Sequence, residues 1–254
     1  MLETVQAIRY VTPLREGGSL PGIVEADDLG TYVMKFRGAG QGLKALVAEV
    51  IVGEIGRTIG LRIPDLRVVA LDARIAKYEA DQEVQDLLMA SVGLNLGVDF
   101  LPGSFGYDGS VPPTRQEAAR VLWLDAFTAN VDRTWSNPNL LVWHGRMWAI
   151  DHGAALYFHH SWPNRAPDPA RFAIQPFDAS KHVLLEVTDD PSPLHQDLAL
   201  IVKGALPGIL DQVPDEWLEP SGAMPDAVAV RAAYSMSLLA RLDYSSAWLP
   251  RMGS

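Results

Sequence analysis

The sequence contains no cysteine, which excludes disulfides, thiolate metal sites and cysteine nucleophiles. It also lacks any run of Lys and Arg, since 21 basic residues are dispersed among 31 acidic ones and the formal net charge is −10. Nucleic acid and anionic membrane surfaces are therefore not expected as main partners. No apolar stretch reaches the ~18 residues of a membrane span, and the start MLETVQAIRY lacks the parts of a secretion signal. We therefore expect a cytoplasmic protein.

The composition is that of a folded enzyme. The 254 residues suffice for one large domain or for two modest lobes with a buried core. Hydrophobic residues make up 48% of the chain and charged residues 20%, a balance far from that of a disordered protein. Most of the chain should therefore fold.

The first part of the chain predicts a β-rich region around one long helix. From Gly42 to Ile59, apolar residues recur at a spacing of three to four, which indicates an amphipathic helix. Short extended segments, separated by turn-forming residues, surround it. The expected strands are residues 5–11, 22–26, 31–37, 66–71 and 95–101, and the second expected helix is residues 81–91.

The second part begins after residues 102–113, where Gly, Pro and Ser dominate and indicate a boundary between lobes. Thr114 and Glu117 are spaced as a capping box that opens a helix over residues 115–130. Two apolar runs joined by His144-Gly145-Arg146 then predict a hairpin. We expect an irregular segment over residues 160–192 and helices from Leu194 onward, with breaks at Pro207, at Pro214 and across residues 219–225.

The strongest functional signal is the segment NVDRTWSNPNLLVW at residues 130–143, followed by AIDHG at residues 149–153. It places the carboxylate of Asp132 at a helix end, the carboxamides of Asn137 and Asn139 just before a strand, and Asp151 where the return strand ends. Each residue alone is an ordinary turn residue. Together they form a set suited to phosphoryl transfer, in which one carboxylate orients the attacking hydroxyl while an Asn oxygen and a second carboxylate hold Mg²⁺.

On these motifs the chain resembles the HipA-like kinases, a bacterial branch of the protein-kinase-like fold whose catalytic loop is related to that of phosphoinositide kinases. The resemblance covers roughly residues 15–160 and is most specific from Asp132 to Gly153. It implies Asp132 as the catalytic carboxylate and Asp151 as a metal ligand. Thr134 stands where related loops often carry a His, which leaves details of the transfer open.

The identity of the Asn that binds the metal also stays open. In the family this Asn lies five residues after the Asp, which selects Asn137, and directly before the strand, which selects Asn139. The present loop is two residues longer, so the two rules disagree. We give slight preference to Asn137, because the length of the loop sets where the ligand oxygen arrives.

Two charged residues in the first part are candidates for the nucleotide site. Lys35 lies in an otherwise apolar strand, which is costly unless its amine meets an anion, and the resemblance implies ATP phosphate as that anion. The family also pairs this lysine with a helix glutamate. A helical wheel favours Glu54, near the centre of the apolar face, whereas the resemblance favours Glu49, and we follow the resemblance.

The remaining nucleotide-site candidates flank these residues. Gly18 and Ser19 lie in a glycine-rich loop whose backbone N–H groups could approach phosphate oxygens. The resemblance implies that Ser19 is a candidate for autophosphorylation. Phe100 and Leu101 end the expected connector between the lobes, where they could serve equally as adenine neighbours or as core residues.

We therefore expect an α+β, bilobal protein-kinase-like fold with a small β-rich N-lobe, residues 1–101, and a mainly helical C-lobe, residues 102–254. The resemblance implies a minimal HipA-like kinase that uses ATP and Mg²⁺ to phosphorylate a hydroxyl, typically Ser or Thr of a protein. A translation enzyme as substrate and an antitoxin-like partner, as in toxin–antitoxin modules, are further implications.

Two other classes of function stay open. The first is a pseudokinase-like regulatory module that binds ATP without transferring phosphate. A protein that only binds ATP has no need of a catalytic carboxylate, so the presence of Asp132 argues against this class. The second is a small-molecule or lipid kinase. The acidic balance of the chain argues against a phosphoinositide substrate at a membrane surface.

Overall fold

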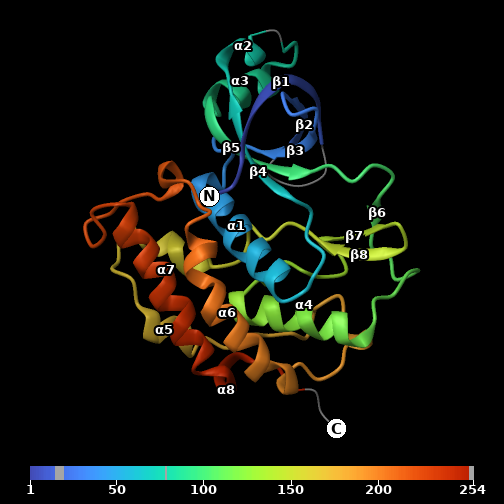
Figure 1. Cartoon of the computed structure of the whole chain (residues 1–254), viewed down its shortest axis with the longest axis vertical. Helices are drawn as coiled ribbons and strands as arrows, with labels where there is room; N and C mark the ends of the chain where they lie inside the picture. Colours follow the sequence, from blue (N-terminus) through green and yellow to red (C-terminus); the bar gives the residue numbers. More distant parts are fainter. Residues whose placement is uncertain (15–19, 78, 252–254) are drawn as a thin grey trace. The chain divides into compact units, whose positions relative to one another are not determined.

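A computed structural model describes residues 1–14, 20–77 and 79–251, and the chain divides into two compact units (Figure 1). The first unit comprises Met1–Leu46 and Pro64–Pro102, and the second comprises Val47–Ile63 and Gly103–Ser254. Most of helix α1, Gly42–Thr58, thus groups with the second unit. The lobe boundary predicted from the sequence, after residue 101, places the whole helix in the first lobe.

The first unit is built around a closed barrel of five strands in the order β1-β2-β3-β5-β4. The barrel closes because β1 pairs antiparallel with β2 on one side and parallel with β4 on the other. Alternate residues of β2 and β3 point into the core, as expected for strands with one buried face. The strands are β1 Thr4–Pro13, β2 Gly22–Ala26, β3 Thr31–Lys35, β4 Leu66–Leu71 and β5 Gly93–Asp99.

Two short helices pack on this barrel. Helix α2, Ala73–Ala76, and helix α3, Gln82–Ala90, lie beside the strands in Figure 1. Val84 and Leu88 of α3 belong to the same buried cluster as Val24 and Met34 of the strands. This cluster is the hydrophobic core of the first unit.

The second unit is centred on helix α4, Arg115–Thr128, and its predicted capping box is confirmed. The side chain of Thr114 accepts from the backbone N–H of Glu117, and the Glu117 side chain accepts from that of Thr114. Every residue from Val121 to Thr128 is buried. A charged residue within this stretch therefore requires partners.

The predicted hairpin is also confirmed, as part of a three-stranded sheet in the order β6-β7-β8. His144 and Gly145 connect two strands and both have positive φ, the conformation of a two-residue turn that matches the twist of a hairpin. The strands are β6 Phe105–Gly106, β7 Leu140–Trp143 and β8 Arg146–Ala149.

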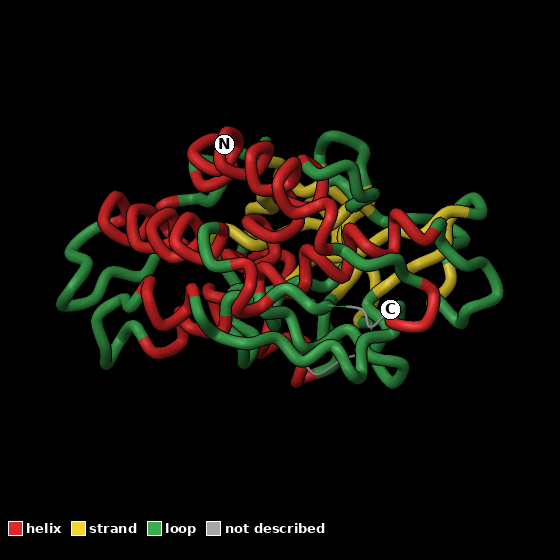
Figure 2. Tube along the Cα trace, turned by 90° about the horizontal axis from the view of Figure 1, so that it is seen from below, coloured by secondary structure: helices red, strands yellow, loops and turns green. Residues whose placement is uncertain are grey.

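The remaining helices of the second unit, drawn in red in Figure 2, include one element that the sequence analysis did not expect. Helix α5, Pro169–Ala173, lies in the segment predicted to be irregular and begins with Asp168 as its N-cap. The predicted break at Pro207 is wrong, because Pro207 lies inside helix α6, His195–Leu210. It occupies the last turn, where the residue four positions earlier, Lys203, is exposed and its carbonyl can bond to water. Helices α7, Ala227–Leu242, and α8, Ser245–Trp248, follow.

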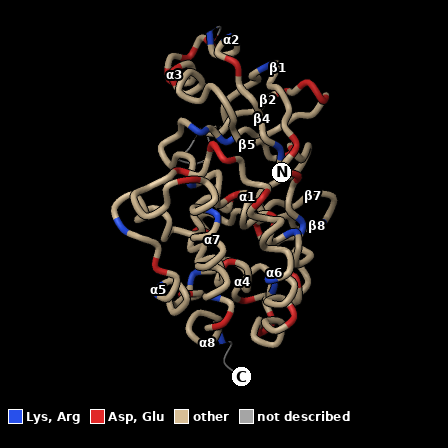
Figure 3. The backbone as a smooth tube through the Cα atoms, turned by 60° about the vertical axis from the view of Figure 1, so that its left-hand side comes forward, with Lys and Arg blue, Asp and Glu red and all other residues tan. Residues whose placement is uncertain are grey.

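Charged residues are spread along the whole backbone. Figure 3 shows Lys and Arg scattered singly along the backbone rather than gathered in one run. Within the described part of the chain, no helix combines the length and the apolar character needed to cross a membrane. Taken over all its elements, the structure has a mixed α and β content, with a β-rich first unit and a second unit made mainly of helices.

Candidate active site

Asp132 is placed by the way in which helix α4 ends. Ala129 adopts the left-handed conformation, with φ 55°, and turns the chain away from the helix axis. Asn130 then fixes the turn: its backbone N–H donates to the Asp125 carbonyl at 2.8 Å, its Nδ2 donates to Asp125 Oδ1 at 3.0 Å, and its Oδ1 accepts from the Asp132 backbone N–H at 3.2 Å. Asp132 thus follows a buried turn that is fixed by hydrogen bonds.

Both candidate carboxamides contact Asp132. Asn137 Nδ2 donates to Asp132 Oδ2 at 2.9 Å. Asn139 Nδ2 donates to the Asp132 backbone carbonyl at 2.7 Å and lies 3.5 Å from its Oδ2. Asn139 is buried, with 8% exposure, whereas Asn137 is exposed. The structure therefore brings together all three residues, but it holds Asn139 more rigidly.

A tight turn explains how the longer loop accommodates both carboxamides. Thr134 and Asn137 exchange two backbone hydrogen bonds, at 3.0 and 3.1 Å, and the two residues between them are exposed. The chain then returns so that Asn139, with φ 48°, reaches back to Asp132. The turn thus lets both carboxamides reach Asp132.

Asp151 joins the site through its neighbour Ile150. The Ile150 backbone N–H donates to the Asn139 carbonyl at 3.1 Å, which connects the end of strand β8 to the loop that carries Asp132. Asp151 is exposed and has φ 53°. A non-glycine residue in this conformation is uncommon and is often found at functional positions. The backbone thus turns directly after β8 at the predicted metal ligand.

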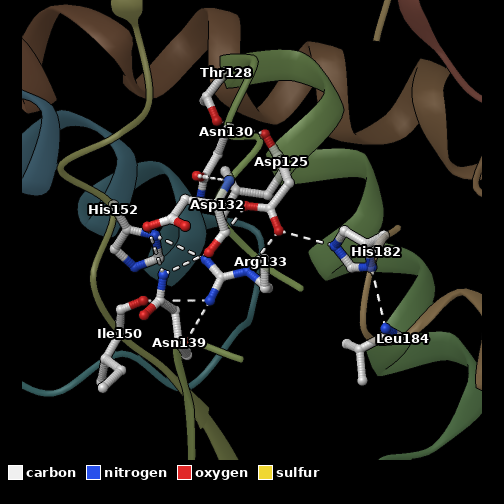
Figure 4. Close-up of polar contacts among 11 residues, drawn as sticks. Asp125, Thr128, Asn130, Asp132, Arg133, Asn139, Ile150, His152, His182 and Leu184 are labelled. Atoms are coloured by element: carbon white, nitrogen blue, oxygen red, sulfur yellow. Dashed lines mark hydrogen bonds and ion pairs between the residues drawn. The ribbon is translucent and has the colours of Figure 1, made fainter. Parts of the chain in front are cut away.

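Beneath these residues lies a buried ion pair, shown in Figure 4. Arg133 Nε donates to Asp125 Oδ2 at 2.5 Å, and both side chains are fully buried. Arg133 Nη1 also donates to the Asn139 carbonyl and, at 3.3 Å, to that of Ile150. Burial by itself raises the pKa of Asp125, but the Arg133 guanidinium and the His182 imidazole outweigh it and hold this pKa well below its usual range. Arg133 therefore bonds to the residue before strand β7, Asn139, and to the residue before Asp151, Ile150.

Two histidines complete this network, and their bonds define their tautomers. The Leu184 backbone N–H donates to His182 Nδ1 at 3.2 Å, so the hydrogen lies on Nε2, which donates to Asp125 Oδ2 at 3.0 Å. Arg133 Nη2 lies 3.2 Å from His152 Nδ1 and can only donate, so Nδ1 of His152 accepts. The histidines thus serve as neutral hydrogen-bond partners of the buried pair.

Four supporting residues were not predicted from the sequence: Asp125, Arg133, His152 and His182. Asp125 offered a signal, because a carboxylate within the apolar run Val121–Phe127 must find a partner when the helix is buried. His182 offered none, since it lies 57 residues from Asp125 in the chain.

Glu49 and Glu54 differ clearly in their surroundings. Glu49 is 3% exposed, and its Oε1 accepts from the Gly153 backbone N–H at 2.8 Å, two residues after Asp151. Glu54 instead contacts Arg57 and Gln212, each at 3.3 Å. The helical wheel had placed Glu54 at the centre of the apolar face. Residues 45–53 of α1 are buried on all sides, so the helix has no single apolar stripe on which to centre a wheel.

The remaining nucleotide-site candidates lie in the first unit or outside the described residues. Lys35 ends strand β3, where it pairs with Leu96 of β5. Phe100 and Leu101 follow β5; the Phe100 N–H donates to the Thr31 carbonyl at 3.0 Å, and Leu101 is buried. Gly18 and Ser19 lie outside the described residues. The nucleotide contacts of all these residues stay predictions.

The donor set fits a magnesium ion bound together with a nucleotide. Among residues 1–14, 20–77 and 79–251, no three His, Asp or Glu side chains form a group that could hold a metal. Asn139 and Asp151 would supply only two oxygen ligands. Mg²⁺ characteristically binds in this way, through one or two protein oxygens with the rest from water and phosphates.

Comparison with known proteins identifies the family of the chain. The chain matches the family of HipA-like kinases over residues 7–250. Because the match covers nearly the whole sequence, the protein belongs to the HipA-like kinase family, as the motifs at Asp132 and Asp151 had indicated. A comparison with curated proteins gave no match.

Three solved structures show distant likeness. A crystal structure of the Golgi casein kinase has a TM-score of 0.41 and 13% identity, covering 96% of this chain and 72% of that one. The Helicobacter pylori proinflammatory kinase CtkA has a TM-score of 0.41 and 11% identity, covering 96% and 95%. The Golgi casein kinase with Mn/ADP bound has a TM-score of 0.39 and 12% identity, covering 96% and 74%.

Proposed function

We propose that this HipA-like kinase transfers the γ-phosphate of ATP to the hydroxyl of Ser or Thr in a protein. The observation that carries the proposal is the set of contacts around Asp132. Asn137 and Asn139 both bond to Asp132, and the Asn139 carbonyl bonds to Ile150, next to Asp151. Membership of the family supports kinase activity, and the choice of a protein acceptor rests on the resemblance.

Asp132 would orient the acceptor and receive its proton. Its Oδ2 is engaged by Asn137, whereas its Oδ1 accepts no hydrogen bond from any residue in the described ranges. A hydroxyl that donates to Oδ1 would have its oxygen lone pair turned towards the phosphorus. In this proposal Asn137 is a positioning residue, because it fixes the Asp132 carboxylate.

Asn139 and Asp151 would hold the magnesium ion. The amide nitrogen of Asn139 is used by Asp132, which fixes the amide plane and leaves Oδ1 as the ligand atom. These contacts favour Asn139 over Asn137, against the slight preference drawn from loop spacing. When bound, Mg²⁺ neutralises charge on the phosphates.

The other candidates take supporting roles in the proposal. Lys35 would contact ATP phosphates, and Phe100 and Leu101 would lie near the adenine, so that the two units act as the N-lobe and C-lobe of a kinase. Glu49 holds the backbone of Gly153 and thereby the segment that carries Asp151. Autophosphorylation at Ser19, a translation enzyme as substrate, an antitoxin-like partner and a cytoplasmic location stay predictions.

The direct test is transfer of label from γ-labelled ATP in the presence of Mg²⁺. The protein would be incubated with a bacterial protein extract, and phosphoamino acids would be separated after hydrolysis. We expect label on Ser or Thr. Label confined to inorganic phosphate, to lipid or to small molecules would contradict a protein acceptor, and the last two would select the alternative kinase classes.

A further inference from the structure

A cavity of about 750 Å³ lies in the second unit, within the segment from Tyr157 to Pro176. We propose that this cavity, here named the 157–176 pocket, binds an acidic segment of the protein substrate. A carboxylate of that segment would pair with Arg165 and Arg171, while an apolar side chain beside it would contact Tyr157 and Ile174. The inference rests on the proposed function and specifies its substrate class.

The base of the pocket is aromatic and closely packed. The ring centroid of Phe158 lies 4.3 Å from that of Phe172 and 5.4 Å from that of Trp162. At its edge, Tyr157 is 72% and Ile174 58% exposed, although both are large hydrophobic residues. Exposed apolar groups next to a concave site are typical of a binding surface.

A buried arginine holds the pocket wall from behind. Arg241 of α7 is fully buried and donates to the carbonyls of Phe172, at 2.5 Å, and Gln175, at 2.9 Å. Its guanidinium carbon lies 4.5 Å from the Phe172 ring centroid, and its Nη2 donates to the Ala126 carbonyl of α4 at 2.8 Å. The wall is therefore fixed before any ligand arrives, which reduces the entropy cost of binding.

The charge of the pocket rim selects an anion. Arg165 and Arg171 are exposed, and neither forms an ion pair with any residue that the structure describes. The acidic residue of the lining, Asp168, uses Oδ1 to accept the Arg171 backbone N–H at 3.0 Å. Two guanidinium groups can bind a carboxylate through paired hydrogen bonds.

The charge of the whole chain narrows the occupant further. With a net charge of −10, the protein repels an extended polyanion such as nucleic acid. A short peptide with one or two carboxylates experiences that repulsion weakly, while its contact with Arg165 and Arg171 is local. An acidic peptide is therefore the occupant that agrees with both the two arginines of the rim and the negative net charge of the chain.

The position of the pocket limits where the acidic residue lies in the substrate. Tyr157 is six residues after Asp151, a path of at most about 20 Å when fully extended. The real path is shorter, because Asp151 and Leu156 both turn with positive φ and the Leu156 N–H is bonded to the Thr128 carbonyl at 2.9 Å. An extended peptide spans the same distance in about six residues. The apolar residue that contacts Tyr157 should thus lie within about six residues of the phosphorylated hydroxyl, with the acidic residue beside it.

Peptide binding without ATP tests the pocket independently of catalysis. Fluorescent peptides would carry one Ser and a Glu-Glu-Leu segment at stepped distances from it, and matched peptides would carry Gln-Gln-Leu. By fluorescence anisotropy, the best Glu peptide should bind about tenfold tighter than its Gln match, the effect of two open charge-assisted contacts. The double variant Arg165→Ala/Arg171→Ala should lose this preference. Arg146→Ala, which removes an exposed arginine of strand β8, should retain it.

Equal binding of Glu and Gln peptides to the parent protein would contradict the proposal that the pocket binds an acidic segment. An unchanged preference in the double variant would contradict it too. Phosphate transfer to the same peptides separates this outcome from failure of the proposed function. Phosphate transfer without any preference for Glu peptides would contradict peptide binding in the pocket and would support the kinase function. Binding of Glu peptides that depends on the two arginines, without phosphate transfer, would support the pocket and contradict the kinase function.

Discussion

Asn139 contacts both halves of the candidate site. Its side-chain nitrogen donates to the carbonyl of Asp132, and its own carbonyl accepts from Ile150, beside Asp151. It also adopts a left-handed conformation that Asn tolerates better than most residues. Asn139 thus orients the loop that carries Asp132 relative to the end of strand β8.

Substitution at Asn139 and at Asn137 should therefore have different effects on the need for magnesium. Asn139→Ala should raise the Mg²⁺ concentration for half-maximal transfer by at least the ~10–100-fold typical of residues that support a metal ligand. Asn137→Ala, its matched control on the same loop, should mainly lower the maximal rate, because it loosens Asp132. The measurement is a Mg²⁺ titration of transfer, with melting temperatures as a check on folding.

The assignment of Asn139 has a clear contrary result. If Asn137→Ala alone raised the magnesium requirement, the loop-spacing rule of the family would hold and Asn139 would have only a structural role.

At the scale of elements, helix α4 depends on the ion pair at its carboxyl-terminal end. Asp125 is fully buried, and Arg133, Asn130 and His182 supply donors to its two oxygens. Removal of one member of such a buried pair typically costs about 3–5 kcal/mol, because the other charge is left without a partner. Loss of either member should therefore destabilise both the helix and the loop that follows it.

The low pKa of Asp125 makes this stabilisation depend on pH. A carboxyl whose pKa is lower in the folded than in the unfolded protein stabilises the fold above its unfolded pKa, about 3.9 for Asp. This contribution is lost as pH falls below that value towards the lower pKa of the folded state. Between pH 7 and pH 3, the free energy of unfolding should therefore fall less in Asp125→Asn than in the parent protein. Urea unfolding across that range measures it, and equal slopes would show that Asp125 is not the group responsible.

Elements were predictable from the sequence where their signals are local. The capping box at Thr114 and the two-residue turn at His144 each lie within a few residues, and both elements form as expected. Helix α5 has only five residues, too few for a periodic pattern, and was missed.

The site was predictable in the same partial way. The motifs at Asp132 and Asp151 are visible in the sequence, but the contact between Asn139 and Asp132 depends on the backbone pairing of Thr134 with Asn137. The bond from His182 to Asp125 depends on packing between segments 57 residues apart, for which the sequence carries no local pattern.

At the scale of the whole molecule, nucleotide binding should depend on the metal. Without a cation, the exposed carboxylate of Asp151 would repel the triphosphate. ATP with Mg²⁺ at about 100 times its Kd should stabilise the protein by about 2.7 kcal/mol, which corresponds to a rise in Tm of roughly 5–10 °C for a chain of this size. ATP with a chelator should give a much smaller shift. Equal shifts in both conditions would contradict the role given to Asp151.

The role of Asp132 is tested most directly by measuring phosphate transfer and ATP binding in Asp132→Asn. The substitution keeps the size of the side chain and removes the oxygen charge that would accept the hydroxyl proton. We predict that transfer of labelled phosphate falls by about 10²–10⁴-fold, while the Tm shift with Mg-ATP stays at the parental value. Transfer at the parental rate with intact ATP binding would show that Asp132 is not the catalytic carboxylate.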